Sequence, residues 1–216
     1  MEKYVEEIIR LTFSRLGEAY EKHREREISH PLKHLEGESR LVFPCYGKHR
    51  RYETRISEQE LRFAFVEAFN IYCDEKELNL FYSVEVPTKG TYLGFADRNE
   101  EPRIAKDKEH GRSAEFDLVI YDENLNRICL VEFKALNANE HDHKKDFVKL
   151  NNIEEEGYLR YFIEIVKSAN NGTYKNIHGK IQGNESFFRC YSLDEKSEIT
   201  DYICRAQIDK KTKQKT

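Results

Sequence analysis

Residues 115–135 read EFDLVIYDENLNRICLVEFKA, and this stretch decides the fold. Two largely apolar runs, at 114–121 and 127–134, are separated by a segment rich in Asp and Asn. These residue types favour tight turns, because their side chains hydrogen-bond to nearby backbone groups. The two runs are therefore predicted to form a β-hairpin. Both faces of each strand are mostly apolar, which is typical of central strands covered on both sides.

Two acids interrupt this apolar hairpin. A symmetric turn centred between Asn124 and Leu125 places Asp117 directly opposite Glu132. Directly opposed residues of a hairpin have Cβ atoms about 5 Å apart. Two carboxylates at that separation repel each other and attract a cation, and hard oxygen ligands favour Mg²⁺ or Mn²⁺. Lys134 follows Glu132 by two residues, so it lies on the same face of the strand.

Outward from the hairpin, strand and helix patterns follow one another. Ser57 with Glu60 forms a capping box that begins a helix, and helical spacing also predicts an N-terminal helix and a helix at 140–151. Alternating patterns predict further strands at 80–86, 92–96, 158–166 and 185–191, with a turn or short helix at 170–182. The polar segments 28–55 and 97–111 are predicted connections, and 205–216 is a predicted basic, mobile tail.

Composition narrows the class of protein. The 216 residues include 36 Lys and Arg against 40 Asp and Glu, which gives a net charge of −4, and 13 Phe and 13 Tyr can supply one core. An N-terminus that alternates acids with bases and the lack of long apolar runs disfavour secreted and membrane proteins. Five scattered cysteines without a C-x-x-C pair disfavour a disulfide framework or a zinc site, so we expect a reduced, cytoplasmic protein.

The hairpin resembles the PD-(D/E)XK nuclease superfamily, which includes many restriction endonucleases and DNA-repair nucleases. The matching residues are Asp117, then fourteen residues, then Glu132-Phe133-Lys134, with the acids on consecutive antiparallel strands. The helices before and after the hairpin also match the α-β-β-β-α-β core of that superfamily, so the resemblance covers roughly residues 57–191. The proline that precedes the aspartate in the family is here Phe116.

The resemblance implies an α/β (α+β) fold with a restriction endonuclease-like core. Such a core has a mixed central β-sheet flanked by helices, and this chain would add an extra N-terminal helix. The expected division is a nuclease core at 57–204, an accessory region at 1–56 and the tail at 205–216. We expect the accessory region to lie outside the core and to serve either dimerisation, giving a homodimer, or substrate choice.

The resemblance also implies a function. The protein is expected to be a Mg²⁺-dependent nuclease, with Mn²⁺ able to substitute, that hydrolyses phosphodiester bonds in DNA in preference to RNA. Asp117 and Glu132 would hold the metal, and Lys134 would orient the attacking water and offset charge on the phosphate. Glu60 is the candidate for the accessory acid, catalytic and metal-binding, that several branches place on the first core helix. The capping box explains an acid at this position equally well.

Three lysines on the helix after the second acid are candidate nucleic-acid contacts: Lys144, Lys145 and Lys149. Helical spacing would let Lys145 and Lys149 reach one phosphate backbone, although a solvated helix face has the same pattern. The negative net charge does not exclude a nucleic-acid partner, because a local basic groove is sufficient.

Two alternatives remain open. In the first, the chain is a catalytically inactive member of the same fold that serves as a binding or regulatory module. In the second, it is a plain interaction protein in which Glu132 and Lys134 form an ordinary salt bridge. The tripeptide alone does not decide, because an acid-x-Lys pattern also begins at Asp74, Asp142, Asp194 and Asp209. Both alternatives predict that the chain has no metal site.

Overall fold

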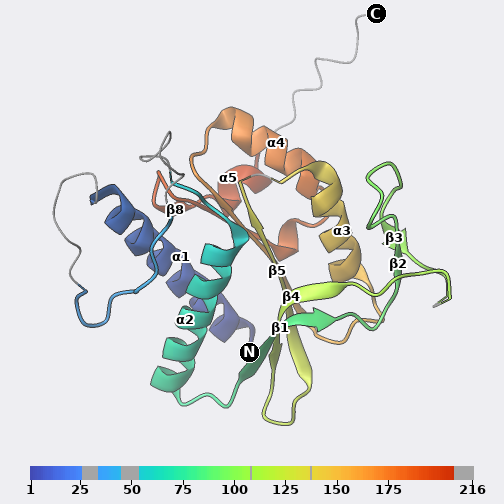
Figure 1. Ribbon diagram of the computed structural model, residues 1–216, viewed down its shortest axis with the longest axis horizontal. Coiled ribbons are helices and arrows are strands. Elements are labelled where there is room, and N and C mark those ends of the chain that lie inside the picture. Colours follow the sequence, from blue (N-terminus) through green and yellow to red (C-terminus); the bar gives the residue numbers. More distant parts are fainter. Residues whose placement is uncertain (26–33, 45–53, 108, 137, 207–216) are drawn as a thin grey trace, which may run out of the picture.

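The computed structural model describes residues 1–25, 34–44, 54–107, 109–136 and 138–206. A six-stranded mixed sheet lies at the centre, in the order β1-β4-β5-β6-β7-β8 (Figure 1). Its β5, β6 and β7 are parallel, and its other neighbouring strands are antiparallel. The strands are β1 (Phe81–Pro87), β4 (Glu115–Tyr121), β5 (Arg127–Ala135), β6 (Leu159–Val166), β7 (Phe188–Ser192) and β8 (Ser197–Glu198).

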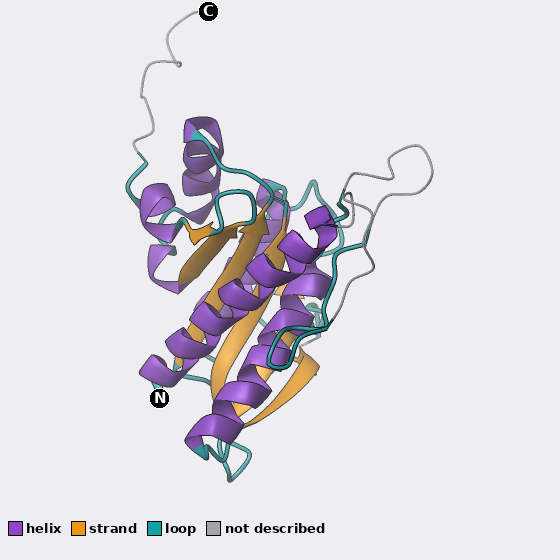
Figure 2. Cartoon of the chain, turned by 90° about the vertical axis from the view of Figure 1, so that its left-hand side faces the viewer, coloured by secondary structure: helices purple, strands orange, loops and turns teal. Residues whose placement is uncertain are grey.

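Helices cover both faces of this sheet. One face packs against α1 (Glu2–Glu25) and α2 (Glu58–Lys76), which lie side by side across the strands in Figure 2. The other face packs against α3 (Glu140–Asn151), α4 (Asn171–Ile181) and α5 (Thr200–Cys204). The predicted mixed sheet with flanking helices is therefore confirmed. None of the helices in the described part of the chain is long and apolar enough to cross a membrane.

The differences from the predicted elements are local. Strand β2 (Tyr92–Leu93) is shorter than the strand predicted at 92–96. It pairs with β3 (Arg103–Ile104), which lies in the segment predicted to be a loop, and the two form a separate small sheet beside α3 (Figure 1). A 3-10 turn at Glu185–Phe187 precedes β7, while β8 and α5 were not predicted. The expected tail lies outside the described residues beyond position 206, as does much of the 28–55 connection.

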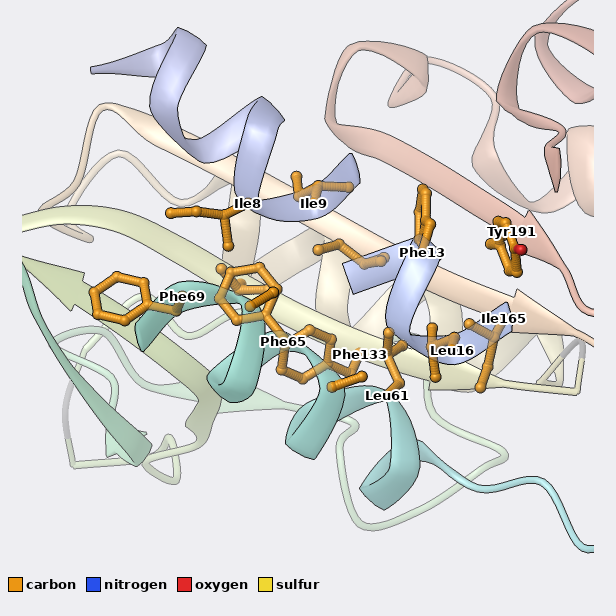
Figure 3. Close-up of a cluster of buried hydrophobic side chains, with 14 of the residues drawn as sticks. Ile8, Ile9, Phe13, Leu16, Leu61, Phe65, Phe69, Phe133, Ile165 and Tyr191 are labelled. Carbon is orange, nitrogen blue, oxygen red and sulfur yellow. The ribbon is translucent and has the colours of Figure 1, made fainter. Parts of the chain in front are cut away.

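The N-terminal helix was expected to lie outside the core, but its apolar side chains are part of the hydrophobic core. Figure 3 shows α1 side chains packed against α2 and the sheet, where Phe13 stacks on Tyr191 with ring centroids 5.0 Å apart. Ile8 and Leu16 are completely buried in the same cluster as Phe133 of β5. The apolar stripe of α1 is thus covered by this chain's own sheet, which removes the physical reason to treat the helix as a separate arm.

The β4–β5 hairpin pairs with the register that the sequence predicted. Leu118 lies opposite Val131. The turn itself is less symmetric than expected, because the pairing shifts by one residue after Ile120. The Asp122 carboxylate accepts backbone N–H groups from residues 124 and 126, at 2.9 and 2.8 Å, and so closes the turn. The irregularity lies next to the turn. At the other end of the hairpin, where the acids are, the observed register therefore agrees with the predicted one.

Candidate functional site

The two predicted acids lie together at the open end of the hairpin. Continuing the Leu118–Val131 register by one residue places Asp117 opposite Glu132. Asp117 Oδ2 accepts the backbone N–H of Phe133 at 2.7 Å, which holds the aspartate against the neighbouring strand. The Glu132 side chain is only 2% exposed. We call Asp117 and Glu132 the acid pair.

An arginine from α2 covers the aspartate of the acid pair. Arg62 Nη2 lies 2.9 Å from Asp117 Oδ1, and Arg62 Nη1 lies 3.2 Å from Glu85 Oε1. The pairs that flank Glu85 on β1 place it opposite Asp117, so acids occupy neighbouring positions on three adjacent strands. The guanidinium therefore balances two of these three charges.

Helix α3 directs Lys149 at the glutamate of the acid pair, and Asp146 of the same helix pairs with that lysine. Lys149 Nζ lies 2.5 Å from Glu132 Oε1 and 2.9 Å from Asp146 Oδ1, and it donates a hydrogen bond to the Glu115 carbonyl at 2.8 Å. The side chains of Lys149 and Asp146 are each 7% exposed. Lysine and aspartate are rarely buried so deeply without a partner, and here each is the partner of the other.

The predicted Lys134 joins the same cluster. Its Nζ lies 2.7 Å from Asp146 Oδ2 and 3.7 Å from Glu58 Oε1, on the first turn of α2. Contacts therefore run in sequence through Glu58, Lys134, Asp146, Lys149 and Glu132. We call these five residues the ion-pair network.

Burial and neighbouring charges shift the pKa values of Glu132 and Asp146 in opposite directions. Burial and the carboxylates of Asp146 and Asp117 raise the pKa of Glu132 well above its usual range, against the opposing effect of Lys149. Burial alone would also raise the pKa of Asp146, but the ammonium groups of Lys149 and Lys134 lower it below its ordinary value. Glu132 is therefore a buried acid whose ionised form needs a positive partner, which Lys149 supplies here.

The two lysines of the network are stable cations. Burial disfavours their charged forms, but the nearby carboxylates outweigh it. Asp146 and Glu58 raise the pKa of Lys134 above its ordinary value, and Glu132 and Asp146 do the same for Lys149. Each lysine thus supplies a fixed positive charge rather than a base.

Glu60 lies elsewhere. Its Oε2 accepts the backbone N–H of Ser57 at 2.9 Å and its Oε1 lies 3.7 Å from Arg55, so the capping box accounts for its position. Among the described residues, the acid of α2 that reaches the network is Glu58, whose pKa is raised chiefly by burial. The two side chains point in different directions from the same helical turn.

The predicted nucleic-acid contacts separate into two groups. Lys149 is buried in the ion-pair network, so the expectation that it faces a phosphate backbone beside Lys145 does not fit its position. Lys145 pairs with Asp142 at 3.0 Å, and the more exposed Lys144 pairs with Glu101 and Glu140 at 3.1 Å each. A phosphate at either lysine would compete with these carboxylates for the ammonium group.

The residues only partly meet the requirements of a metal ion. Their donors are carboxylate oxygens, the ligands Mg²⁺ prefers, and the buried Glu132 Oε1 now has the Lys149 ammonium 2.5 Å away as its partner. The donor chemistry therefore fits. Within the described ranges, however, no three or more His, Cys, Asp or Glu side chains already stand where they could hold a metal.

Sequence reasoning missed Arg62, Glu58, Glu85 and Asp146. One signal was available for Asp146, because it lies in the stripe formed with His143, Phe147 and Leu150, which spacing predicts to face inward. A charged residue in such a stripe needs a buried partner. Searches of family models, curated proteins and solved structures found no match to this chain.

Proposed function

We propose that the protein is a Mg²⁺-dependent nuclease of the PD-(D/E)XK type with a restriction endonuclease-like core, acting on DNA in preference to RNA. The observation that carries the proposal is the hairpin register, which places Asp117 opposite Glu132 on the neighbouring strand, with Lys134 two residues further along β5. An ordinary sheet would not bury this set of charges at the end of two central strands.

The acid pair is where Mg²⁺ would bind, with Mn²⁺ as a substitute and Glu58, which contacts Lys134, as a further carboxylate. The bound ion would polarise the scissile phosphate and lower the pKa of the attacking water. Burial is the main cause of the raised pKa of Glu132, and the carboxylates of Asp146 and Asp117 add to it, so a cation held here would offset the repulsion between these acids. Arg62 and Lys149 now balance the acid pair, so both must shift their contacts when a divalent cation is held there.

Lys134 supplies a fixed positive charge at the reacting phosphate. In the proposed hydrolysis the water oxygen forms a bond to phosphorus, the bond from phosphorus to the leaving oxygen breaks, and the leaving oxygen takes up a proton. By analogy with the superfamily, the product keeps a 5′-phosphate. Charge that gathers on the phosphate during attack is offset by the Lys134 ammonium, which Asp146 holds 2.7 Å away.

A cleavage assay tests the proposal. The purified chain is incubated with plasmid, linear duplex, branched and single-stranded DNA and with RNA, in Mg²⁺, in Mn²⁺ and with a chelator. Cleavage of DNA with either metal and none with the chelator is expected. If nothing is cleaved and calorimetry detects no Mn²⁺ binding, the nuclease proposal fails.

The two acids of α2 should separate in a paired test. Glu58→Gln is expected to lower kcat by about 10- to 100-fold, because Glu58 contacts Lys134. Glu60→Ala is expected to lower the free energy of unfolding by about 0.5–2 kcal/mol through loss of the capping box, with a smaller effect on kcat. Steady-state kinetics and urea denaturation measure the two effects. If Glu60→Ala lowered kcat more than Glu58→Gln does, Glu60 and not Glu58 would be the accessory acid.

A binding or regulatory module of the same fold is the second candidate. The observation that favours it is the pairing of Arg62 with Asp117 and of Lys149 with Glu132, which balances the acid pair with protein cations. Such a module would bind nucleic acid without cleaving it, and its affinity would not depend on Mg²⁺. Titration of labelled duplex with and without the metal distinguishes the two candidates.

A further inference from the structure

We propose that Asp146 is a positioning residue, which holds Lys134 and Lys149 as one rigid unit beside the acid pair. The inference rests on the proposed function for its catalytic consequence, but its structural part can be tested without any catalysis. Asp146 itself contacts neither Asp117 nor Arg62 among the described hydrogen bonds and ion pairs, so it acts through the lysines.

The geometry assigns one lysine to each carboxylate oxygen. Oδ2 of Asp146 lies 2.7 Å from Lys134 Nζ, and Oδ1 lies 2.9 Å from Lys149 Nζ. These lysines come from different elements, β5 and α3, and only a group between them can fix both at once. A lysine side chain has several rotatable bonds, so an ammonium that must meet a phosphate at a defined position benefits from such a holder.

The remaining contacts of the two lysines would not replace this holder. Without Asp146, Lys134 keeps the Glu58 carboxylate at 3.7 Å and the Phe133 carbonyl at 3.0 Å. Lys149 keeps Glu132 and the Glu115 carbonyl. The attraction of the acids would then draw Lys134 toward Glu58 or the acid pair, and its ammonium would leave its present position.

The same helix offers a matched control. Asp142 also lies on α3 and pairs with a lysine three residues later, Lys145, at 3.0 Å, just as Asp146 pairs with Lys149 at 2.9 Å. Asp142 has no described contact with Lys134 or with the acid pair. Asp142→Asn and Asp146→Asn therefore remove the same chemical group from the same type of pair, inside and outside the ion-pair network.

The first measurement is a proton–nitrogen correlation spectrum of the lysine ammonium groups, with Lys134 and Lys149 assigned through Lys134→Met and Lys149→Met. Buried, paired ammonium groups exchange slowly enough with water to be observed. Asp146→Asn is expected to broaden or remove the Lys134 signal and to shift the Lys149 signal, since Lys149 keeps Glu132 and the Glu115 carbonyl. Asp142→Asn is expected to leave both signals in place. Retention of both signals in folded Asp146→Asn would overturn the proposal, whether or not the protein cleaves anything.

The second measurement is steady-state cleavage. Asp146→Asn is expected to lower kcat by about 10- to 100-fold with KM unchanged, while Asp142→Asn leaves both parameters near wild type. Wild-type kcat in folded Asp146→Asn would contradict a positioning role. If the wild-type protein cleaves no substrate, the proposed function fails, and the ammonium spectrum still decides the positioning role.

Asp146→Glu covers the case in which Asp146→Asn does not fold. It keeps the negative charge but moves the carboxylate by one methylene group. Both ammonium signals should then remain at shifted positions, and kcat should lie between those of the wild type and the other network variants. Wild-type signal positions together with wild-type kcat would show that the position of this carboxylate does not matter.

Discussion

Lys134→Ala is expected to lower kcat for DNA cleavage by about 10²- to 10³-fold, the usual cost of removing one preorganised group that stabilises developing charge. The nearby carboxylates raise the pKa of Lys134, so the side chain is an ammonium at every working pH and no other group would take over its charge. Its burial keeps water from screening that charge. KM should change much less, because the interaction strengthens mainly in the transition state.

The matched control for this variant is Lys76→Ala. Lys76 is an exposed lysine on the last turn of α2, at the opposite end of the helix from Glu58. Steady-state kinetics on a plasmid substrate should show wild-type kcat for Lys76→Ala, and circular dichroism should show that both variants fold. Equal cleavage by Lys134→Ala and the wild type would mean that the active site lies elsewhere.

Phe13→Ala is expected to lower the free energy of unfolding by about 3–5 kcal/mol, the range for removing a buried aromatic side chain. Phe13 belongs to the N-terminal helix, is 4% exposed and stacks on Tyr191 of β7 (Figure 3). The replacement would leave a cavity between α1 and the sheet, in the same hydrophobic cluster as Phe133 beneath the acid pair. Urea denaturation with an unchanged m-value would measure the loss.

Phe63→Ala provides the comparison on the neighbouring helix. Phe63 lies on α2 but is 60% exposed, so its removal should change the free energy of unfolding by less than about 0.5 kcal/mol. If Phe13→Ala were no more destabilising than Phe63→Ala, α1 would lie outside the core, as the sequence analysis expected.

The fold was predictable where its signals are local. The turn at Asp122, the apolar runs beside it and the Ser57–Glu60 capping box depend on residues close together in the sequence. All three formed, and only the turn differs, by a one-residue shift in the pairing next to it. Strand β3, which pairs with β2, was missed because a two-residue strand carries too little pattern to distinguish it from a loop. The place of α1 was mistaken because an apolar stripe does not reveal which surface covers it.

The sequence by itself determined that Asp117 and Glu132 are neighbours, because strand alternation and a short turn leave few other registers. Only the tertiary structure decided which partners surround them. Glu58 and Glu60 differ by about 200° around the helix axis, and the packing of α2 on β5 directs the first to Lys134 and leaves the second at its cap. The packing of α3 likewise turned Asp146 and Lys149 inward. Contacts between distant segments depend on how those elements pack, which no local pattern encodes.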